Sequence, residues 1–79
     1  MSLVHTFGGM LIVIEAYVDP ADGSWCATSH VCPEKLDKPL PELTSRTANH
    51  VTALDAKRVA LTLAESAIRA FRDAQDHSS

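Results

Sequence analysis

Residues 52–74, TALDAKRVALTLAESAIRAFRDA, carry the pattern that decides the fold. Thr52 and Asp55 have the spacing of a capping box, with Asp in place of the preferred Glu, so a helix is predicted to begin after Thr52. Apolar residues then recur at intervals of three and four as far as Phe71, which is typical of a helix with one buried face. The pattern predicts a long C-terminal helix over 53–74 and a frayed tail over 75–79.

The apolar face of this predicted helix is wider than a small sheet can cover. At 100° per residue it spans about 200°, whereas a surface helix needs a stripe of roughly 100°. Much of it is alanine, which permits close backbone approach but is also the best helix former. We therefore expect a second copy of the helix to cross the first in a two-fold dimer. Leu61 and Ile68 are expected to meet the sheet, and an alanine flank to approach the other subunit: Ala56, Ala60, Ala67 and Ala74.

Residues 10–31 precede the helix and are typical of a β-hairpin. Residues 11–18 are short, β-branched and almost wholly apolar, which predicts a central strand that is covered on both faces. Residues 19–23 supply Pro, Asp and Gly, each of which favours a turn. The expected register places Tyr17 opposite Trp25, which would form an aromatic cross-strand pair.

Gly8-Gly9 is a two-residue hairpin signal. It would pair Leu3–Phe7 with Met10–Ile14 as a third strand, although residues 1–9 are equally interpreted as an extension before a start at Met10. The sequence thus predicts a single α+β domain over 1–79, in which an antiparallel two- or three-stranded meander packs against one long C-terminal α-helix.

Residues 32–51 carry the weakest pattern. Three prolines interrupt regular structure, and residues 33–36 are compatible with one helical turn that has Pro in its favoured first position. Residues 43–50 have no apolar face, so they predict at most an edge strand. Because long structureless loops are uncommon in compact domains, we expect this segment to be pinned to the sheet or to a partner.

Composition excludes several function classes. The net charge of −3, with dispersed basic residues, argues against nucleic-acid binding. The longest apolar run, residues 10–14, is too short to span a bilayer, and the first nine residues lack the basic character of a secretory signal. A cytoplasmic location is expected, where the two cysteines would stay reduced.

Cys26, His30 and Cys32 share one strand parity and therefore one face of the predicted sheet. Cys26 and His30 would lie about 13 Å apart along the strand, too far to share one metal ion. Both cysteines are interpreted as small buried hydrophobes, and the sequence predicts no metal, cofactor or catalytic residue. The alternative is a small ligand- or metal-binding protein or an enzyme that uses Cys26, His30, Cys32 and His50.

Two segments resemble the HicB-type antitoxins. Residues 18–29, VDPADGSWCATS, are similar to the hairpin of that family, and Thr52-Ala53-Leu54-Asp55-Ala56 is similar to the start of its helix. Cys32-Pro33-Glu34 stands where the family usually has Pro-Gly-Cys, and no DNA-binding element follows Phe71. The resemblance implies a toxin-binding partial fold without an operator-binding part.

The sequence thus favours a non-enzymatic, homodimeric protein–protein interaction module with an unidentified protein partner. Neither nucleic acid nor membrane is expected as a partner. The expected mechanism is recognition by apolar surface and by strand addition at an exposed sheet edge. The residues expected at the interface are aromatic or lie on the helix: Tyr17, Trp25, Ala56, Ala60, Leu61, Ala67, Ile68 and Phe71.

Overall fold

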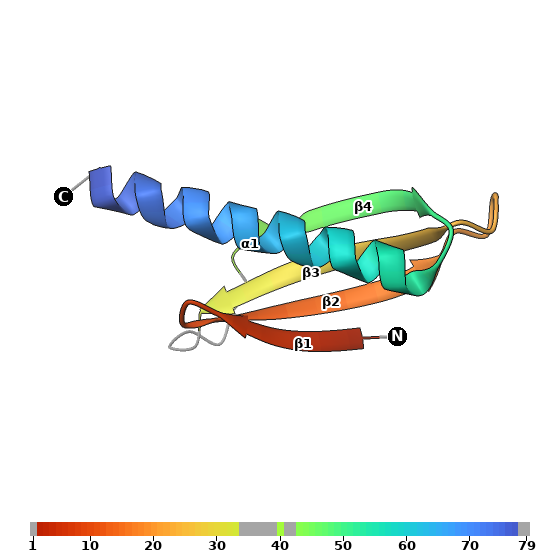
Figure 1. Ribbon diagram of the computed structural model, residues 1–79, viewed down its shortest axis with the longest axis horizontal. Helices are drawn as coiled ribbons and strands as arrows, with labels where there is room; N and C mark the ends of the chain where they lie inside the picture. Colours follow the sequence, from red (N-terminus) through yellow and green to blue (C-terminus); the bar gives the residue numbers. More distant parts are fainter. Residues whose placement is uncertain (1, 34–39, 41–42, 78–79) are drawn as a thin grey trace.

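The computed structural model describes residues 2–33, 40 and 43–77, with the side chains described as far as residue 74. Its elements are β1 (Ser2–Phe7), β2 (Met10–Val18), β3 (Trp25–Pro33), β4 (Ser45–His50) and α1 (Ala53–His77). The strands form one antiparallel sheet in the order β1-β2-β3-β4, and α1 packs against β2, β3 and β4 (Figure 1). The predicted fold class is confirmed, with four strands instead of two or three.

The β1–β2 hairpin forms as its glycines predict. Gly8 and Gly9 have φ angles of 58° and 80°, and positive φ at both central residues is what a tight two-residue turn of this hand requires. The register runs from Phe7 opposite Met10 to Ser2 opposite Glu15 and includes the predicted pairing of Leu3 with Ile14. Residues 2–7 are therefore a strand of the sheet, as one of the two interpretations predicted.

The β2–β3 register differs by one residue from the expected one. Tyr17 lies opposite Cys26, and Val18 lies opposite Trp25. The cause is the turn, in which the Asp19 N–H donates to the Ser24 carbonyl and keeps Ser24 inside the loop. A shift of one residue reverses the face of every side chain, so Tyr17 and Trp25 lie on opposite faces of the sheet and form no cross-strand pair.

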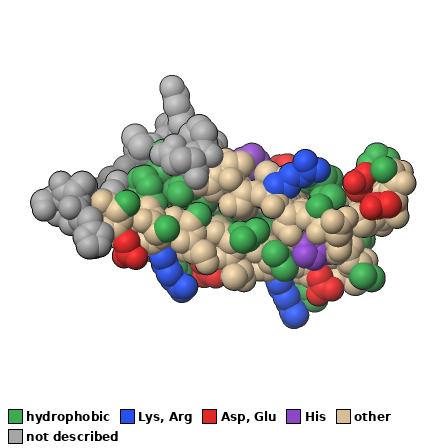
Figure 2. Space-filling view, turned by 90° about the horizontal axis from the view of Figure 1, so that it is seen from above, with side chains coloured by type: hydrophobic (Ala, Val, Ile, Leu, Met, Phe, Trp, Pro, Cys, Tyr) green, Lys and Arg blue, Asp and Glu red, His purple; other side chains and the backbone are tan. Residues whose placement is uncertain are grey.

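Two aspartates stabilise this turn, which projects from one end of the molecule (Figure 1). The Asp19 carboxylate accepts the Ala21 N–H, and the Asp22 carboxylate accepts both the hydroxyl and the N–H of Ser24. These bonds from Ser24, the hydroxyl first, hold the pKa of Asp22 below its usual value. Acidic side chains gather at this end in the space-filling view (Figure 2).

Strand β4 forms the second edge of the sheet, in the part of the chain where at most an edge strand was expected. Ser45 and Thr47 pair with β3, but a β-bulge interrupts the ladder before His50 pairs with Trp25. Asn49 occupies the bulge with a φ of 66°, a left-handed conformation that Asn tolerates better than most residues. The Thr47 hydroxyl and the His50 Nε2 lie 2.6 Å apart across it.

The described residues of the segment before β4 are pinned to the sheet, as expected. The Leu40 N–H donates to the Val31 carbonyl at 2.8 Å, and the Leu43 N–H donates to the Leu40 carbonyl at 3.0 Å. Leu43 is buried in the core. The helical turn predicted over 33–36 lies outside the described residues except for Pro33, which ends β3.

The helix begins at the predicted cap. The Thr52 Oγ1 accepts the Asp55 N–H at 3.1 Å, the bond that a capping box requires of its first residue. The helix continues to His77, beyond the predicted end at residue 74, and residues 78–79 are not described. No helix in the described part of the chain is long and apolar enough to cross a membrane.

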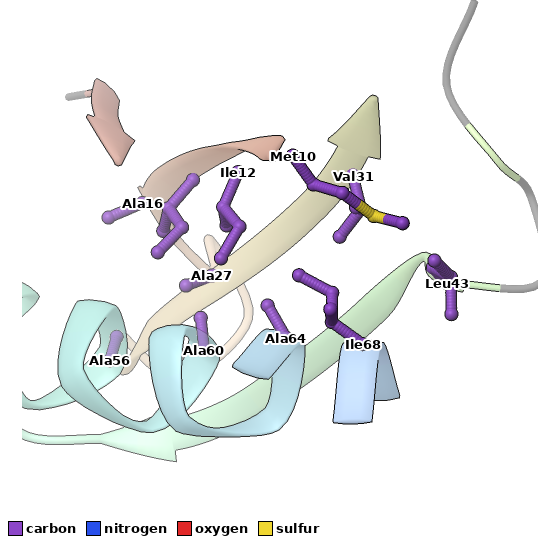
Figure 3. Close-up of a cluster of buried hydrophobic side chains, with 11 residues drawn as sticks. Met10, Ile12, Ala16, Ala27, Val31, Leu43, Ala56, Ala60, Ala64 and Ile68 are labelled. Atoms are coloured by element: carbon purple, nitrogen blue, oxygen red, sulfur yellow. The ribbon is translucent and has the colours of Figure 1, made fainter. Parts of the chain in front are cut away.

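The core is a close contact between α1 and the middle of the sheet. The helix residues that point at the sheet are spaced by four: Ala56, Ala60, Ala64 and Ile68. They meet Ile12, Ala16, Ala27 and Val31 from the two central strands (Figure 3). Three successive alanines let the helix backbone approach the sheet, and Ile68 fills the wider space toward Met10 and Leu43.

The alanine flank was therefore expected on the wrong side. Ala56 and Ala60 are buried inside one protomer, because the small side chains bring the helix close to its own sheet and not to a second helix. Ala67 packs partly against the same core, and Ala74 is exposed. Ile68 meets the sheet as predicted, and Leu61 packs against the rim of the core.

One polar group in this interior has no partner among the described residues. The Ser29 side chain lies on the buried face of β3, opposite Ile14, and its hydroxyl makes no hydrogen bond to the part of the chain that the structure describes. A buried hydroxyl without a partner keeps its full desolvation cost, which is about 1–3 kcal/mol.

Ile68→Ala is expected to lower the free energy of unfolding by about 2–5 kcal/mol, because it removes the largest helix side chain in the core. Ala60→Glu should unfold the protein, since it places an unpaired carboxylate under the helix. Ala74→Glu, at an exposed position of the same helix, is the control and should change stability by less than about 0.5 kcal/mol. Urea unfolding followed by circular dichroism measures all three; a folded Ala60→Glu variant would contradict this core.

Ser29→Ala is expected to raise the free energy of unfolding by about 1 kcal/mol, since it removes a buried hydroxyl that has no partner. Thr28→Ala, at the next position but on the other face, should give no such gain. Thermal unfolding of both variants beside the parent chain makes the comparison. A loss of stability in Ser29→Ala would show that the hydroxyl is satisfied in solution.

Candidate functional site

The sheet has one face that α1 does not cover. The prediction that residues 11–18 are covered on both faces is therefore wrong, since Glu15 and Tyr17 are exposed on this face. Ile12, Ile14 and Ala16 point to the helix, so the alternate residues of β2 point away from it. We call this surface the helix-free face. Register with β2 places on it Val4 from β1, Leu11, Val13, Glu15 and Tyr17 from β2, Cys26, Thr28, His30 and Cys32 from β3, and Arg46 from β4.

Cys26 is fully buried although it lies on the helix-free face. Tyr17 is its register partner on β2, and Arg46 interacts with both side chains from β4. The charge interaction with Tyr17, then hydrogen bonds to Tyr17 and Cys26, raise the pKa of Arg46, which is charged at neutral pH in any case. The Tyr17 hydroxyl also lies 3.4 Å from the Thr28 Oγ1. The cluster covers the thiol and places the positive charge of Arg46 beside it.

The Cys and His residues singled out in the sequence do not gather in one place. Cys26, His30 and Cys32 share the helix-free face, as their spacing predicted, while His50 pairs with Trp25 on the helix side. Neither of the two cysteines forms a disulfide bond. Among the described residues, no three His, Cys, Asp or Glu side chains lie close enough to hold a metal ion, and no pocket is present.

The residues expected at an interface divide into three groups. Tyr17 is exposed on the helix-free face. Trp25, Leu61, Ala67 and Phe71 are half-buried and pack against the core from the helix side. Ala56, Ala60 and Ile68 are buried within one protomer, so their assignment to a contact between subunits is corrected.

Strand β1 is the part of the sheet that the helix leaves most open. Its residues from Ser2 to Thr6 are all exposed, with Leu3 at 40% on the helix side and Val4 at 63% on the helix-free face. Its hairpin end contacts α1. The Arg69 Cζ lies 5.3 Å from the centre of the Phe7 ring, and the Arg72 guanidinium approaches Gly8.

Sequence reasoning missed two features of this surface. Arg46 was not considered, because its place beside Cys26 depends on a β4 register that no turn signal announces. The openness of β1 was also missed, although its sequence, SLVHTF, has neither the Lys nor the Pro that commonly protects an edge strand.

The described geometry thus offers two surfaces, the helix-free face and the outer edge of β1, and the comparisons with known proteins add no assignment to either. Neither the protein-family models, nor the curated proteins, nor the solved structures compared with the chain gave a match.

Proposed function

We propose that this chain is a non-enzymatic protein–protein interaction module that acts as a homodimer. The observation that carries the proposal is the amount of apolar surface that one copy leaves uncovered. The exposed large hydrophobic residues are Leu3, Val4, Tyr17, Val18, Val51, Leu54, Val59 and Leu63. Apolar side chains that one copy leaves exposed can be removed from water by association with a second copy.

The thinness of the core supports the same proposal. The helix contributes three alanines and one isoleucine to the buried cluster, so little apolar surface is removed from water per residue. Domains below about 80 residues rarely obtain more than a few kcal/mol from one core, and oligomerisation is a common remedy. A second copy would bury more apolar surface without any change in the fold.

The resemblance to HicB-type antitoxins suggests what a further partner would be. On that resemblance, the module would bind a toxin-type protein and would leave operator binding to another component. Capture of the tagged chain's partners from the native host, followed by mass spectrometry, tests this part of the proposal. If no toxin-type protein is recovered, the resemblance to HicB-type antitoxins no longer supports the proposal.

The alternative function needs Cys26, His30, Cys32 and His50 in one site. No observation favours it, since the Cys26 thiol is covered by its neighbours and His50 bonds Thr47 on the other side of the sheet. A ligand that used all four groups would therefore have to displace the existing contacts of Cys26 and His50, which lie on opposite faces of the sheet.

Sedimentation at micromolar concentrations is expected to give a species of twice the 8.5 kDa chain mass. The physical reason is that association removes exposed apolar side chains from water. Dilution should shift the distribution toward monomer. A single 8.5 kDa species at every concentration would contradict the proposal.

Chelator is expected to leave the melting temperature unchanged. A structural metal site contributes its binding free energy to folding, so removal of a resident ion would lower the melting temperature sharply. Thermal unfolding monitored by circular dichroism, with and without excess EDTA, is the measurement. A clear drop would restore the metal-binding alternative.

A further inference from the structure

We infer that the two copies of the proposed homodimer join through the outer edge of β1. In this arrangement β1 pairs antiparallel with β1 of the second copy, about a two-fold axis that passes beside Val4. The two four-stranded sheets become one continuous sheet with both helices on the same side. The inference rests on the proposed function and names the surface by which the homodimer forms.

Half of the backbone N–H and C=O groups of β1 point away from β2, toward the outer edge of the sheet. In a hairpin with a two-residue loop, the residues that flank the loop exchange both hydrogen bonds, and bonded pairs then alternate along the strands. Phe7, opposite Met10, is such a residue. The N–H and C=O groups of Ser2, Val4 and Thr6 therefore point away from β2, toward an edge where the described chain places no other strand.

The outer edge of β1 is complementary to the same edge of a second copy. A two-fold axis at Val4 sets Val4 opposite Val4 of the second copy, and Ser2 opposite Thr6 of the second copy. All three positions have outward backbone groups, so each facing pair exchanges two hydrogen bonds. No Lys, Arg, Asp or Glu occurs in β1, so like charges do not oppose one another. The axis also passes beside Val4, the most exposed large hydrophobic residue of the sheet.

The other edge of the sheet, formed by β4, is protected against the addition of a further strand. Strand β4 carries the charged Arg46 and a bulge in which Asn49 has positive φ, and both features hinder the addition of a further strand. Pairing of β1 with β1 joins the two open edges, so the assembly ends in a protected β4 strand on each side. The association therefore closes at two copies, which favours a second copy of this chain over any other strand.

The geometry can be tested by disulfide cross-linking with single cysteines. The Cα atoms of facing residues in a bonded antiparallel pair are about 5.5 Å apart, within the range that a disulfide spans. Val4→Cys should cross-link efficiently on mild oxidation. Thr6→Cys on the same edge should cross-link no more than the parent chain does, because the two cysteines at position 6 would be about 13 Å apart. A mixture of Ser2→Cys and Thr6→Cys chains should cross-link. The parent chain gives the background from Cys26 and Cys32.

A backbone variant supplies an independent measurement. Val4→Pro removes the outward N–H at the axis and no bond to β2, so the dissociation constant should rise about tenfold or more while the circular dichroism spectrum is kept. Val4→Thr retains the N–H and is the matched control, with a dimer close to that of the parent chain.

The outcomes separate the two claims. A parent chain that is monomeric at every concentration overturns both the homodimer and this interface. A dimeric parent chain in which Val4→Cys stays at background, Thr6→Cys cross-links as well as Val4→Cys, or folded Val4→Pro dimerises normally overturns the interface alone.

Discussion

The close approach of α1 to the two central strands is the contact on which the rest of the structure depends. It exists because Ala56, Ala60 and Ala64 lie four residues apart on one side of the helix and carry no bulk beyond the β-carbon. Dispersion contacts weaken steeply with distance, so a thin layer of small side chains is effective only when the two backbones come close. The sheet must then present a surface of matching depth, which Ala16 and Ala27 provide beneath the first turns of the helix.

This contact also explains the asymmetry of the sheet. A helix is about 10 Å wide, so at close range it covers about two to three strands. It packs on β2, β3 and β4, and β1 lies beyond it except at the hairpin end, where Arg69 and Arg72 reach across. Because strand residues alternate between faces, half of the sheet's side chains lie on the face that α1 does not cover. The two candidate surfaces, the helix-free face and the outer edge of β1, are therefore the parts of the sheet that one helix is too narrow to cover.

Much of this architecture could be predicted from local patterns, because those patterns act locally in the folded chain. Gly8-Gly9 fixes a two-residue turn, and Thr52 caps the helix through its own hydroxyl. The features that were predicted wrongly depend on contacts distant in sequence. The β2–β3 register depends on a hydrogen bond between Asp19 and Ser24 that keeps one more residue in the loop. The surface that buries the helix alanines is the sheet of the same protomer, which the helical pattern alone does not distinguish from a second helix. On the candidate surfaces, the shared face of Cys26, His30 and Cys32 followed from parity alone. Arg46 could not be placed beside them, because no turn signal defines the register of β4.

The meander topology has a consequence for how the chain folds. Every strand pairs with its neighbour in sequence, so each pairing closes a modest loop, and topologies of this kind fold faster than those built from distant pairings. The sheet alone has no second layer, however, and a solitary sheet with two wet faces has little stability. During synthesis the strands emerge before the helix that buries one of their faces. The hairpins would therefore form early and reversibly, and docking of α1 would be the step that makes folding cooperative.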